Sequence, residues 1–437
     1  MSAASRTFLF FPWSHGVGFG YIGRELTIAA ELRAAGHRCV FACDTEEGIV
    51  ARCGFEVRAA PGAHGRAVPD MGRRRGEYIS IDNLDTAFAI TGYYHLSRLR
   101  EDMEADLAII EAVRPDAVVV DMQPTAALAA RYTRTALISV GDSDFFRPTS
   151  NSWMPWLPAA SMVSPYPSCL PAFNALAAEL GLAGFDTVSA VLLGDWTLVA
   201  STPELERNQE PLPPAENMRF VGPVFWDPPW SDVAGTLAGH GADRRRIYVT
   251  LGHGGKATMD QLGPILRACD DDRLAVFVSL GFRPPEDDLD LPGNVRVGGF
   301  TGIARPIGWA DAVISHGGYS TVLTSLQHGK PQIVIPFMSE QEANGQLFVE
   351  DNDAGFLLRR TRRAEHGRRH FTHVLRYTGD SEDGRCDEGE WRKAVNEILT
   401  DRRHRDGAER AGRAIAGYVA GRSFAELFAS FVGRSAR

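Results

Sequence analysis

The sequence lacks the patterns of a disulfide protein, a metal protein, a membrane protein and a secreted protein. Its six cysteines, spread over 437 residues, form no Cys-x-x-Cys pair, so we expect reduced structural thiols and no metal site. No apolar run reaches the roughly 20 residues of a membrane span, and the nearest, 190–200, is interrupted by Asp195. Only Arg6 precedes the apolar run Phe8–Phe11, and no small-residue cleavage site follows it, so no signal peptide is expected. We therefore expect a cytoplasmic protein.

An excess of positive charge is also missing. The formal net charge is −9, which argues against a nucleic-acid-binding protein. The composition, 44% hydrophobic and 23% charged, is that of an ordinary globular protein. A chain of 437 residues is too long for one hydrophobic core, so two domains are expected. The oligomeric state stays open, with a homodimer as one option.

Short apolar segments alternate with helical patterns along the whole chain. Such strands predict parallel sheets covered on both faces, and so an α/β fold with one sheet in each half. One helix is predicted from Ile22 to Leu32, with Gly36 as its C-cap glycine. The predicted strands are Thr7–Phe11, Arg38–Ala42, Ala117–Val120 and Thr135–Val140, followed by 246–251, 274–280, 294–299, 312–315 and 332–337.

Prolines mark the connection between the two halves. Residues 203–229 contain seven prolines, a density typical of an interdomain connection and not of a packed element. We place the first domain at 1–225 and the second at 236–415.

A glycine cluster near the N-terminus matches the dinucleotide-binding pattern. Gly18, Gly20 and Gly23 fit G-x-G-x-x-G, and Asp44 follows 21 residues after the last glycine. However, six residues separate Phe11 from Gly18, whereas the pattern wants its first glycine at the end of the strand. A dinucleotide-dependent oxidoreductase therefore stays only as an alternative.

The most informative segment is 311–356. An apolar strand, Ala312–Ile314, is followed by His316-Gly317-Gly318 and at once by a helical segment, Ser320–Gln327. Free backbone N–H groups and the positive end of the helix dipole would meet past the strand. This arrangement predicts an anion-binding site.

Several motifs in fixed order resemble the GT-B glycosyltransferases of family 1, which include the UDP- and natural-product glycosyltransferases. The second half carries the family's H-G-G-x-G-T, G-x-P, D/E-Q-x-x-N and G-x-G motifs, and the first half its opening loop and helix end. They stand here as His316–Thr321, Gly329-Lys330-Pro331, Glu340–Asn344 and Ala354-Gly355-Phe356, with Gly20–Arg24 and Arg33–His37 in the first half.

The resemblance implies two Rossmann-like domains that face each other across a cleft. The first would bind a small-molecule acceptor and the second a nucleotide-sugar, UDP- or TDP-linked, as in antibiotic biosynthesis. It also implies an inverting, metal-independent transfer with no cofactor beyond the sugar nucleotide. The C-terminal helix, 416–437, would pack back on the first domain.

The resemblance assigns donor-binding roles. The leaving diphosphate would be bound by His316, Gly317, Gly318, Ser320 and Thr321. Ser320 replaces the family's usual glycine, and either narrows donor choice or caps the helix. The sugar hydroxyls would be bound by Glu340 and Gln341, with Asn344 in the same motif; Phe300 would stack on the base or belong to the core, and His253 could reach the diphosphate.

The acceptor side departs from the family, whose base is a loop histidine oriented by an aspartate. Asp121 stands where that aspartate belongs, but Tyr21 takes the place of the histidine. A free tyrosine titrates near ~10, so it is a poor base at pH 7. Three readings stay open: His15 supplies the imidazole, Asp121 or another group acts directly, or the chain is a non-catalytic helper protein on the same fold. Candidate acceptor walls are the aromatic residues within 145–170 together with Tyr93 and Tyr94.

Overall fold

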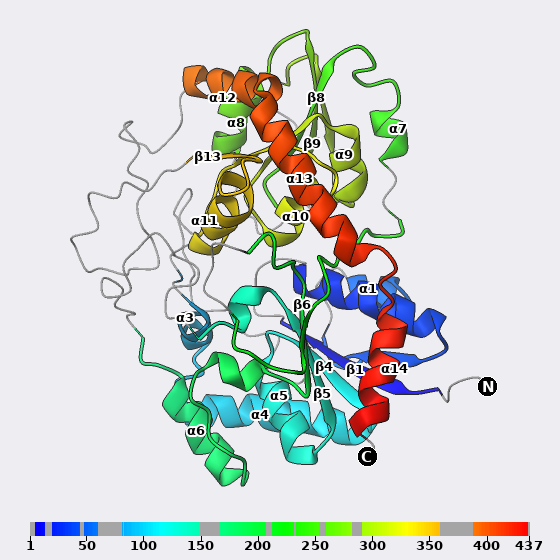
Figure 1. The fold of residues 1–437 in the computed structure, drawn as a ribbon, viewed down its shortest axis with the longest axis vertical. Coiled ribbons are helices and arrows are strands. Elements are labelled where there is room, and N and C mark those ends of the chain that lie inside the picture. Colours follow the sequence, from blue (N-terminus) through cyan, green and yellow to red (C-terminus); the bar gives the residue numbers. More distant parts are fainter. Residues whose placement is uncertain are drawn as a thin grey trace.

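The computed structural model consists of two lobes, each built on one parallel sheet (Figure 1). It describes residues 5–13, 20–43, 48–59, 81, 83–148, 166–206, 212–230, 233–252, 259–281, 291–358 and 388–435. Among these residues, no helix is long and apolar enough to cross a membrane.

The first lobe has a seven-stranded sheet in the order β3-β2-β1-β4-β5-β6-β7. Its strands are β1 (Thr7–Pro12), β2 (Arg38–Phe41), β3 (Glu56–Val57), β4 (Ala117–Asp121), β5 (Ala136–Gly141), β6 (Trp196–Val199) and β7 (Met218–Phe220). Its helices are α1 (Gly20–Ala34), α2 (Ile49–Arg52), α3 (Leu84–Ile90), α4 (Leu96–Val113), α5 (Pro124–Thr133), η1 (Ser143–Phe145), α6 (Leu170–Glu179) and η3 (Ser189–Leu192).

The second lobe repeats this order in six strands, β10-β9-β8-β11-β12-β13. Its strands are β8 (Arg245–Thr250), β9 (Leu274–Ser279), β10 (Val295–Gly298), β11 (Ala312–Ser315), β12 (Gln332–Val334) and β13 (Gly355–Leu357). The remaining helices are α7 (Ala234–Leu237), α8 (Met259–Ala268), α9 (Ala304–Trp309), α10 (Tyr319–Gln327), α11 (Ser339–Asn344), the π-helix η4 (Gly345–Glu350), α12 (Glu388–Thr400), α13 (Arg402–Val419) and α14 (Phe424–Ser435).

The strand order gives each lobe one switch point. In both sheets the order reverses once, between β1 and β4 in the first and between β8 and β11 in the second. Ligands of open parallel sheets bind at such switch points, past the carboxyl ends of the strands. The two-sheet α/β prediction is confirmed, and Gly36 ends α1 with φ +91°, as its predicted C-cap role requires.

The proline-rich connection is more structured than expected. The prediction that 203–229 holds no packed element is wrong for Met218–Phe220, which forms β7 and pairs with β6. Three residues are too few to show an alternating pattern. Three further strands, β3, β6 and β13, were also not predicted. Conversely, β12 ends at Val334, before Pro336, because proline has no N–H to donate to the ladder.

The C-terminal helices cross from the second lobe to the first, as the red ribbon in Figure 1 shows. Phe424, Phe428 and Phe431 of α14 are buried in the same apolar cluster as Phe8 and Phe10 of β1. The Phe8 and Phe428 rings lie edge to face with centroids 5.4 Å apart. The end of the chain is therefore part of the core of the first lobe.

This return path runs beside the outward connection at residues 221–224. The Arg422 guanidinium donates to the carbonyl oxygens of Val221 and Pro223, both at 2.8 Å. Gly222 has φ +72°, and a Cβ there would lie 2.9 Å from the Tyr418 Cβ. The two crossings thus pack against each other.

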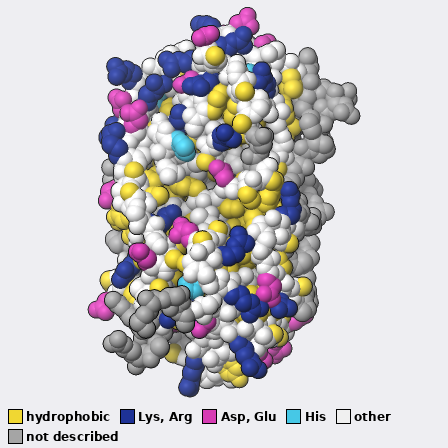
Figure 2. Space-filling model, turned by 90° about the vertical axis from the view of Figure 1, so that its right-hand side faces the viewer, with side chains coloured by type: hydrophobic (Ala, Val, Ile, Leu, Met, Phe, Trp, Pro, Cys, Tyr) yellow, Lys and Arg dark blue, Asp and Glu magenta, His cyan; other side chains and the backbone are white. Residues whose placement is uncertain are grey.

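Charged groups of both signs are mixed on the surface. On the face shown in Figure 2, lysine and arginine side chains are interspersed with carboxylates, and apolar side chains gather toward the middle of the molecule. This face therefore has no broad basic area of the kind that binds nucleic acid.

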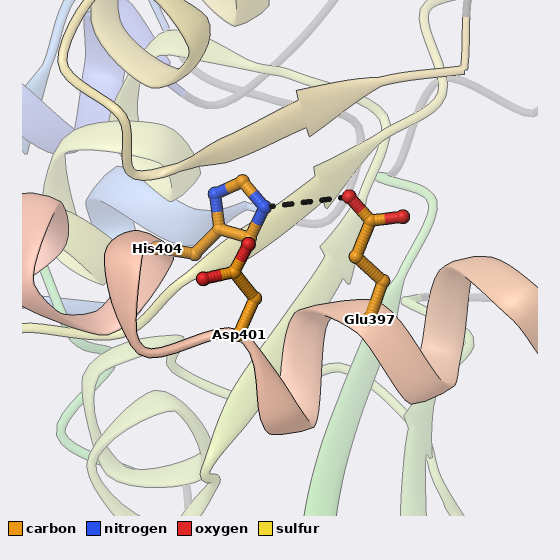
Figure 3. A group of neighbouring side chains, drawn as sticks. All are labelled: Glu397, Asp401 and His404. Carbon is orange, nitrogen blue, oxygen red and sulfur yellow. Dashed lines mark ion pairs between the residues drawn. The ribbon is translucent and has the colours of Figure 1, made fainter.

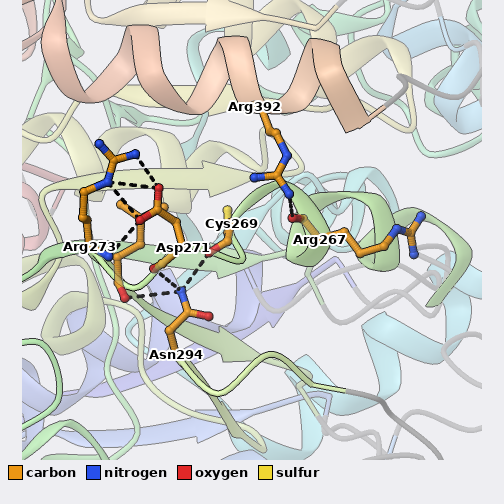
Figure 4. A network of polar contacts seen from close by, with 7 residues as sticks. Arg267, Cys269, Asp271, Arg273, Asn294 and Arg392 are labelled. Atoms are coloured by element: carbon orange, nitrogen blue, oxygen red, sulfur yellow. Dashed lines mark hydrogen bonds and ion pairs between the residues drawn. The ribbon is translucent and has the colours of Figure 1, made fainter.

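The cysteines and one aspartate cluster have structural roles. Cys39, Cys43, Cys53, Cys169 and Cys269 form no disulfide, and burial raises the pKa of Cys269 to about 12. Beside it, the Asn294 amide donates to the carbonyl oxygens of Cys269 (2.8 Å) and Asp271 (3.1 Å). The Asp271 carboxylate is bound by Arg273 at 2.6 Å (Figure 4). This loop is fastened by its own side chains.

Candidate active site

The predicted anion site lies at the switch point of the second lobe. Ser315 of β11 is paired in register with Thr250 of β8, so His316 and Gly252 follow the ends of two neighbouring strands. The His316 amide donates to the Thr250 carbonyl oxygen at 3.3 Å. His316 is half-buried past the end of β11.

Two glycines make room for this imidazole. A Cβ on Gly252 would lie 2.8 Å from the His316 Nε2, and a Cβ on Gly318 would lie 2.6 Å from the same atom. Real Cβ atoms do not approach other atoms so closely. The ring is therefore held between two stretches of bare backbone.

Gly317 is needed for its backbone conformation as well as for space. Its φ is +87°, and a Cβ there would lie 2.6 Å from the carbonyl oxygen of Gln341. The Asn344 amide donates to the Gly317 carbonyl at 3.0 Å and to the Glu340 carboxylate at 2.5 Å. The Glu-Gln-x-x-Asn motif of α11 thus braces the His-Gly-Gly turn.

Two helix N-termini face each other across the lobes. Helix α10 begins at Tyr319 and α1 begins at Gly20. A Cβ on Gly20 would lie 3.6 Å from the Ser320 Oγ. The alternative that Ser320 caps the helix is wrong, because Gly318 holds the N-cap position of α10. The positive ends of the two helix dipoles therefore lie next to each other.

The lobes also touch through side chains beside these helix ends. The Tyr319 hydroxyl donates to the carbonyl oxygen of Ala200 at 3.2 Å. The backbone N–H of Ile81 donates to the Ser339 Oγ at 2.9 Å, and the Ser339 hydroxyl donates in turn to the Ile81 carbonyl.

The remaining predicted donor residues differ in their surroundings. Glu340 is half-buried, whereas Gln341 is buried and its amide oxygen accepts the Phe337 N–H at 2.9 Å. Phe300 is half-buried and packs against Trp226, with ring centroids 6.4 Å apart. Thr321 is buried in the first turn of α10. His253 and His15 lie outside the described residues.

On the first lobe, Asp121 ends β4 beside the end of β1, as predicted. Its side chain is fully buried, and both carboxylate oxygens accept from Arg24, from Nε at 2.7 Å and from Nη2 at 3.1 Å. Arg24 also pairs with Asp142, which follows β5. Burial raises the pKa of Asp121 to about 7, although Arg24 opposes that rise.

Sequence reasoning gave Arg24 no role and missed Asp142. The available signal was the pair of carboxylates at the ends of neighbouring strands, since two buried aspartates require a buried cation between them. Arg24 is three residues after Tyr21 on α1, and therefore on the same side of that helix.

Tyr21 lies between the lobes. Burial raises the pKa of its hydroxyl well above 10, and the carboxylates of Asp142 and Glu340 add to this rise. The ring packs at 6.0 Å from that of Phe145. Tyr21 is therefore protonated and neutral, and it brings the first lobe's helix α1 near Glu340 of the second lobe.

Of the predicted acceptor walls, part belongs to the core. Tyr93 and Phe146 are buried in the main apolar cluster of the first lobe. Tyr94 and Tyr166 are half-buried and contact each other, with centroids 6.0 Å apart.

Comparisons with known proteins identify the fold. The chain matches two solved glycosyltransferase structures over nearly all its length: calicheamicin glycosyltransferase CalG4 (TM-score 0.70, 18% identity, 100% of both chains) and SnogD from Streptomyces nogalater (TM-score 0.67, 21% identity, 99% of this chain and 100% of the other). The chain has the GT-B fold of these proteins. The expected resemblance to GT-B natural-product glycosyltransferases is confirmed.

Sequence comparisons of the GT-B chain agree. Residues 274–381 match the family "Erythromycin biosynthesis protein CIII-like, C-terminal domain". A PGL/p-HBAD biosynthesis glycosyltransferase of Mycobacterium tuberculosis is 28% identical over 62% of this chain and 65% of its own. A Mycobacterium bovis protein named an inactive glycosyltransferase of the same pathway is 30% identical over 46% of this chain and 58% of its own. The chain thus spans less than two thirds of the length of these curated relatives.

Proposed function

We propose that this chain is an inverting, metal-independent glycosyltransferase. It would move a sugar from a UDP- or TDP-sugar to a hydroxyl group of a small natural-product acceptor. The observation that carries the proposal is that the N-termini of α10 and α1 lie next to each other, with His316 three residues before the start of α10.

The chemistry of the leaving group supports this assignment. When the bond from the sugar's anomeric carbon to the diphosphate breaks, negative charge grows on the leaving oxygen. Backbone N–H groups at the start of α10, the helix dipole and His316 would stabilise that charge without a metal ion. The rhamnosyltransferase SpnG has been solved as a complex with thymidine diphosphate (TM-score 0.64, 16% identity, 97% of this chain and 99% of the other). This favours TDP over UDP as the nucleotide of the donor.

Glu340 is the proposed partner of the donor sugar's hydroxyl groups. Its carboxylate is half-buried at the junction of the lobes, and the Asn344 amide fixes one of its oxygens. The Phe337 N–H fixes the Gln341 amide oxygen, which leaves both hydrogens of its amide nitrogen for a ligand.

For the acceptor proton we favour His15 as the general base. The acceptor oxygen would attack the anomeric carbon as its proton passes to His15, and the nucleoside diphosphate would leave. Asp121 is a poor candidate for the same task because Arg24 binds both of its oxygens. It would act as a positioning residue that holds Arg24 and the start of α1.

A helper protein without transfer activity is the second candidate. Two observations favour it: the raised pKa of Tyr21 at the usual place of the base, and the curated relative that is named inactive. Such a protein would still bind the nucleotide.

A thermal-shift panel of UDP, TDP, GDP, NAD and NADP tests the proposal. We expect a rise in melting temperature with UDP or TDP and none with NAD or NADP. Stabilisation by NAD alone would favour the oxidoreductase alternative and overturn the proposal. If a nucleoside diphosphate binds, release of that nucleotide from its sugar in the presence of candidate acceptors separates the enzyme from the helper protein, with His15→Ala as the test of the base.

A further inference from the structure

A histidine and two carboxylates converge away from the candidate active site, where α12 meets α13. Glu397 lies in the last turn of α12, Asp401 is the N-cap residue of α13, and His404 lies in the first turn of α13. One ligand atom from each lies within 4.8 Å of the other two (Figure 3). Among the described residues this is the one such group that the structure contains.

His404 is built as a fixed ligand. Its side chain is 3% exposed, and the ring is held by Phe356 (centroids 5.6 Å apart) and by the Asp353 carbonyl oxygen, 3.4 Å from Nδ1. Because Nδ1 donates to that carbonyl, the lone pair lies on Nε2. Nε2 is buried without a hydrogen-bond partner and points at Glu397.

The backbone that presents the Asp353 carbonyl is itself specialised. Asp353 has φ +55°, a left-handed conformation that is uncommon outside glycine. Gly407 of α13 packs directly on it, since a Cβ there would lie 2.4 Å from the Asp353 oxygen. The imidazole orientation is thus set by packed backbone on its Nδ1 side.

The two carboxylates can close on this fixed nitrogen. The Glu397 and Asp401 side chains are 43% and 39% exposed, and Glu397 Oε1 is already 3.8 Å from His404 Nε2. Asp401 accepts the Arg403 N–H through Oδ1, and its Oδ2 has only an exposed ion pair with the Arg403 guanidinium at 3.7 Å, which a metal ion would have to displace. The negative end of the α12 dipole also favours a cation here.

We propose that Glu397, Asp401 and His404 form a binding site for a divalent transition metal of the Zn²⁺ type, with water in the remaining position. One imidazole nitrogen and two carboxylate oxygens suit Zn²⁺, whereas Mg²⁺ prefers six oxygen ligands. The ion would join α12 to α13, the helix that leads back to the first lobe. It has no part in the proposed sugar transfer.

The test is a titration of the untagged, EDTA-treated full chain with ZnCl₂. Binding is measured by calorimetry and by the change in melting temperature, and MgCl₂ is titrated in parallel. We expect one Zn²⁺ per chain at this site, a higher melting temperature and no response to Mg²⁺. Asp401→Asn keeps the N-cap acceptor, and Glu397→Gln changes an exposed side chain, so both variants should fold. The double variant should lose at least about tenfold in Zn²⁺ affinity.

Glu104→Gln, an exposed substitution on α4, is the matched control and should bind Zn²⁺ as the wild type does. The histidine is tested by His404→Gln, with circular dichroism as the check of folding. Absence of Zn²⁺ binding to the wild type, or undiminished binding by the double variant, would overturn the proposal.

Discussion

At the scale of single residues, the imidazole of His316 depends on two glycines from different parts of the chain. Gly252 follows β8 and Gly318 follows β11, and both leave space for the ring. Strand order brings them together, because β8 is paired directly with β11.

Replacement of His316 is expected to weaken nucleotide binding. His316→Ala removes a donor from the proposed diphosphate site, and a hydrogen bond to a charged group contributes about 1.5–3 kcal/mol. We expect the affinity for the stabilising nucleoside diphosphate to fall roughly 10- to 100-fold in calorimetry. His95→Gln, an exposed histidine at the start of α4, should leave the affinity unchanged. Equal affinity in His316→Ala would remove this residue from the site.

Gly317 and Gly36 allow the stability cost of adding a methyl group to be compared between a crowded and an open glycine position. Both have φ near +90°, at +87° and +91°, but a Cβ on Gly36 would meet nothing within 4 Å. Gly36→Ala should therefore cost only the backbone strain, about 1 kcal/mol. Gly317→Ala should cost clearly more in urea unfolding and should also reduce nucleotide binding. Similar losses in both variants would show that the contact with Gln341 is unimportant.

At the scale of elements, most strands were predicted, and those that were not (β3, β6, β7 and β13) have four residues or fewer. β1, β4 and β5 are continuous apolar runs, so their burial on both faces could be read directly. β7 has three residues with Arg219 in the middle, and only its pairing with β6 makes it a strand. Asp121 at the end of β4 was likewise found, but its partner Arg24 was not, because the pair joins residues 97 positions apart.

Around the turn after β5, buried carboxyl groups outnumber the basic side chains that pair with them. Arg147 in this segment pairs with Glu206 at 2.6 Å, and Asp144 of η1 reaches Arg147 only at 3.5 Å. Burial raises the pKa of Asp144 to about 7, and Glu206 and Asp142 add to the rise. Asp144 is therefore a buried carboxyl group that shares its basic partner, Arg147, with Glu206.

This imbalance predicts a pH-dependent stability. The pKa of Asp144 is higher in the folded chain, about 7, than the ordinary value of 3.8, so the folded state holds the extra proton between these values. The free energy of unfolding should fall as pH rises through this window, by up to about 1.4 kcal/mol per pH unit. Asp144→Asn should lose this contribution, so that its stability advantage over the wild type grows from pH 5 to pH 8 in urea titrations. The exposed variant Asp243→Asn should follow the wild type, and a constant difference for Asp144→Asn would contradict the prediction.

At the scale of the whole molecule, the two lobes are joined by paired crossings and by contacts beside the candidate active site. Residues 221–224 lead out of the first sheet, and α13 and α14 lead back. The family resemblance gave this return path in outline, but not the aromatic residues that anchor it.

Phe428 should be essential for the stability of the first lobe. It is fully buried against Phe8, so Phe428→Ala should reduce the free energy of unfolding by about 3–5 kcal/mol. Tyr132→Ala, at a side chain that is 47% exposed, should change it by less than about 0.5 kcal/mol. The measurement is urea unfolding followed by circular dichroism, and a small effect of Phe428→Ala would mean that α14 is dispensable for the core.

The position of α14 has a consequence for protein synthesis. The backbone N–H of Phe424 donates to the carboxylate of Glu31, a residue translated 393 positions before it. The core around β1 and α1 therefore cannot be completed while the chain is still being translated through the second lobe. On the ribosome the nascent first lobe would expose the apolar surface of Phe8 and its neighbours for most of that time, and the second lobe would have the opportunity to fold before the first is complete.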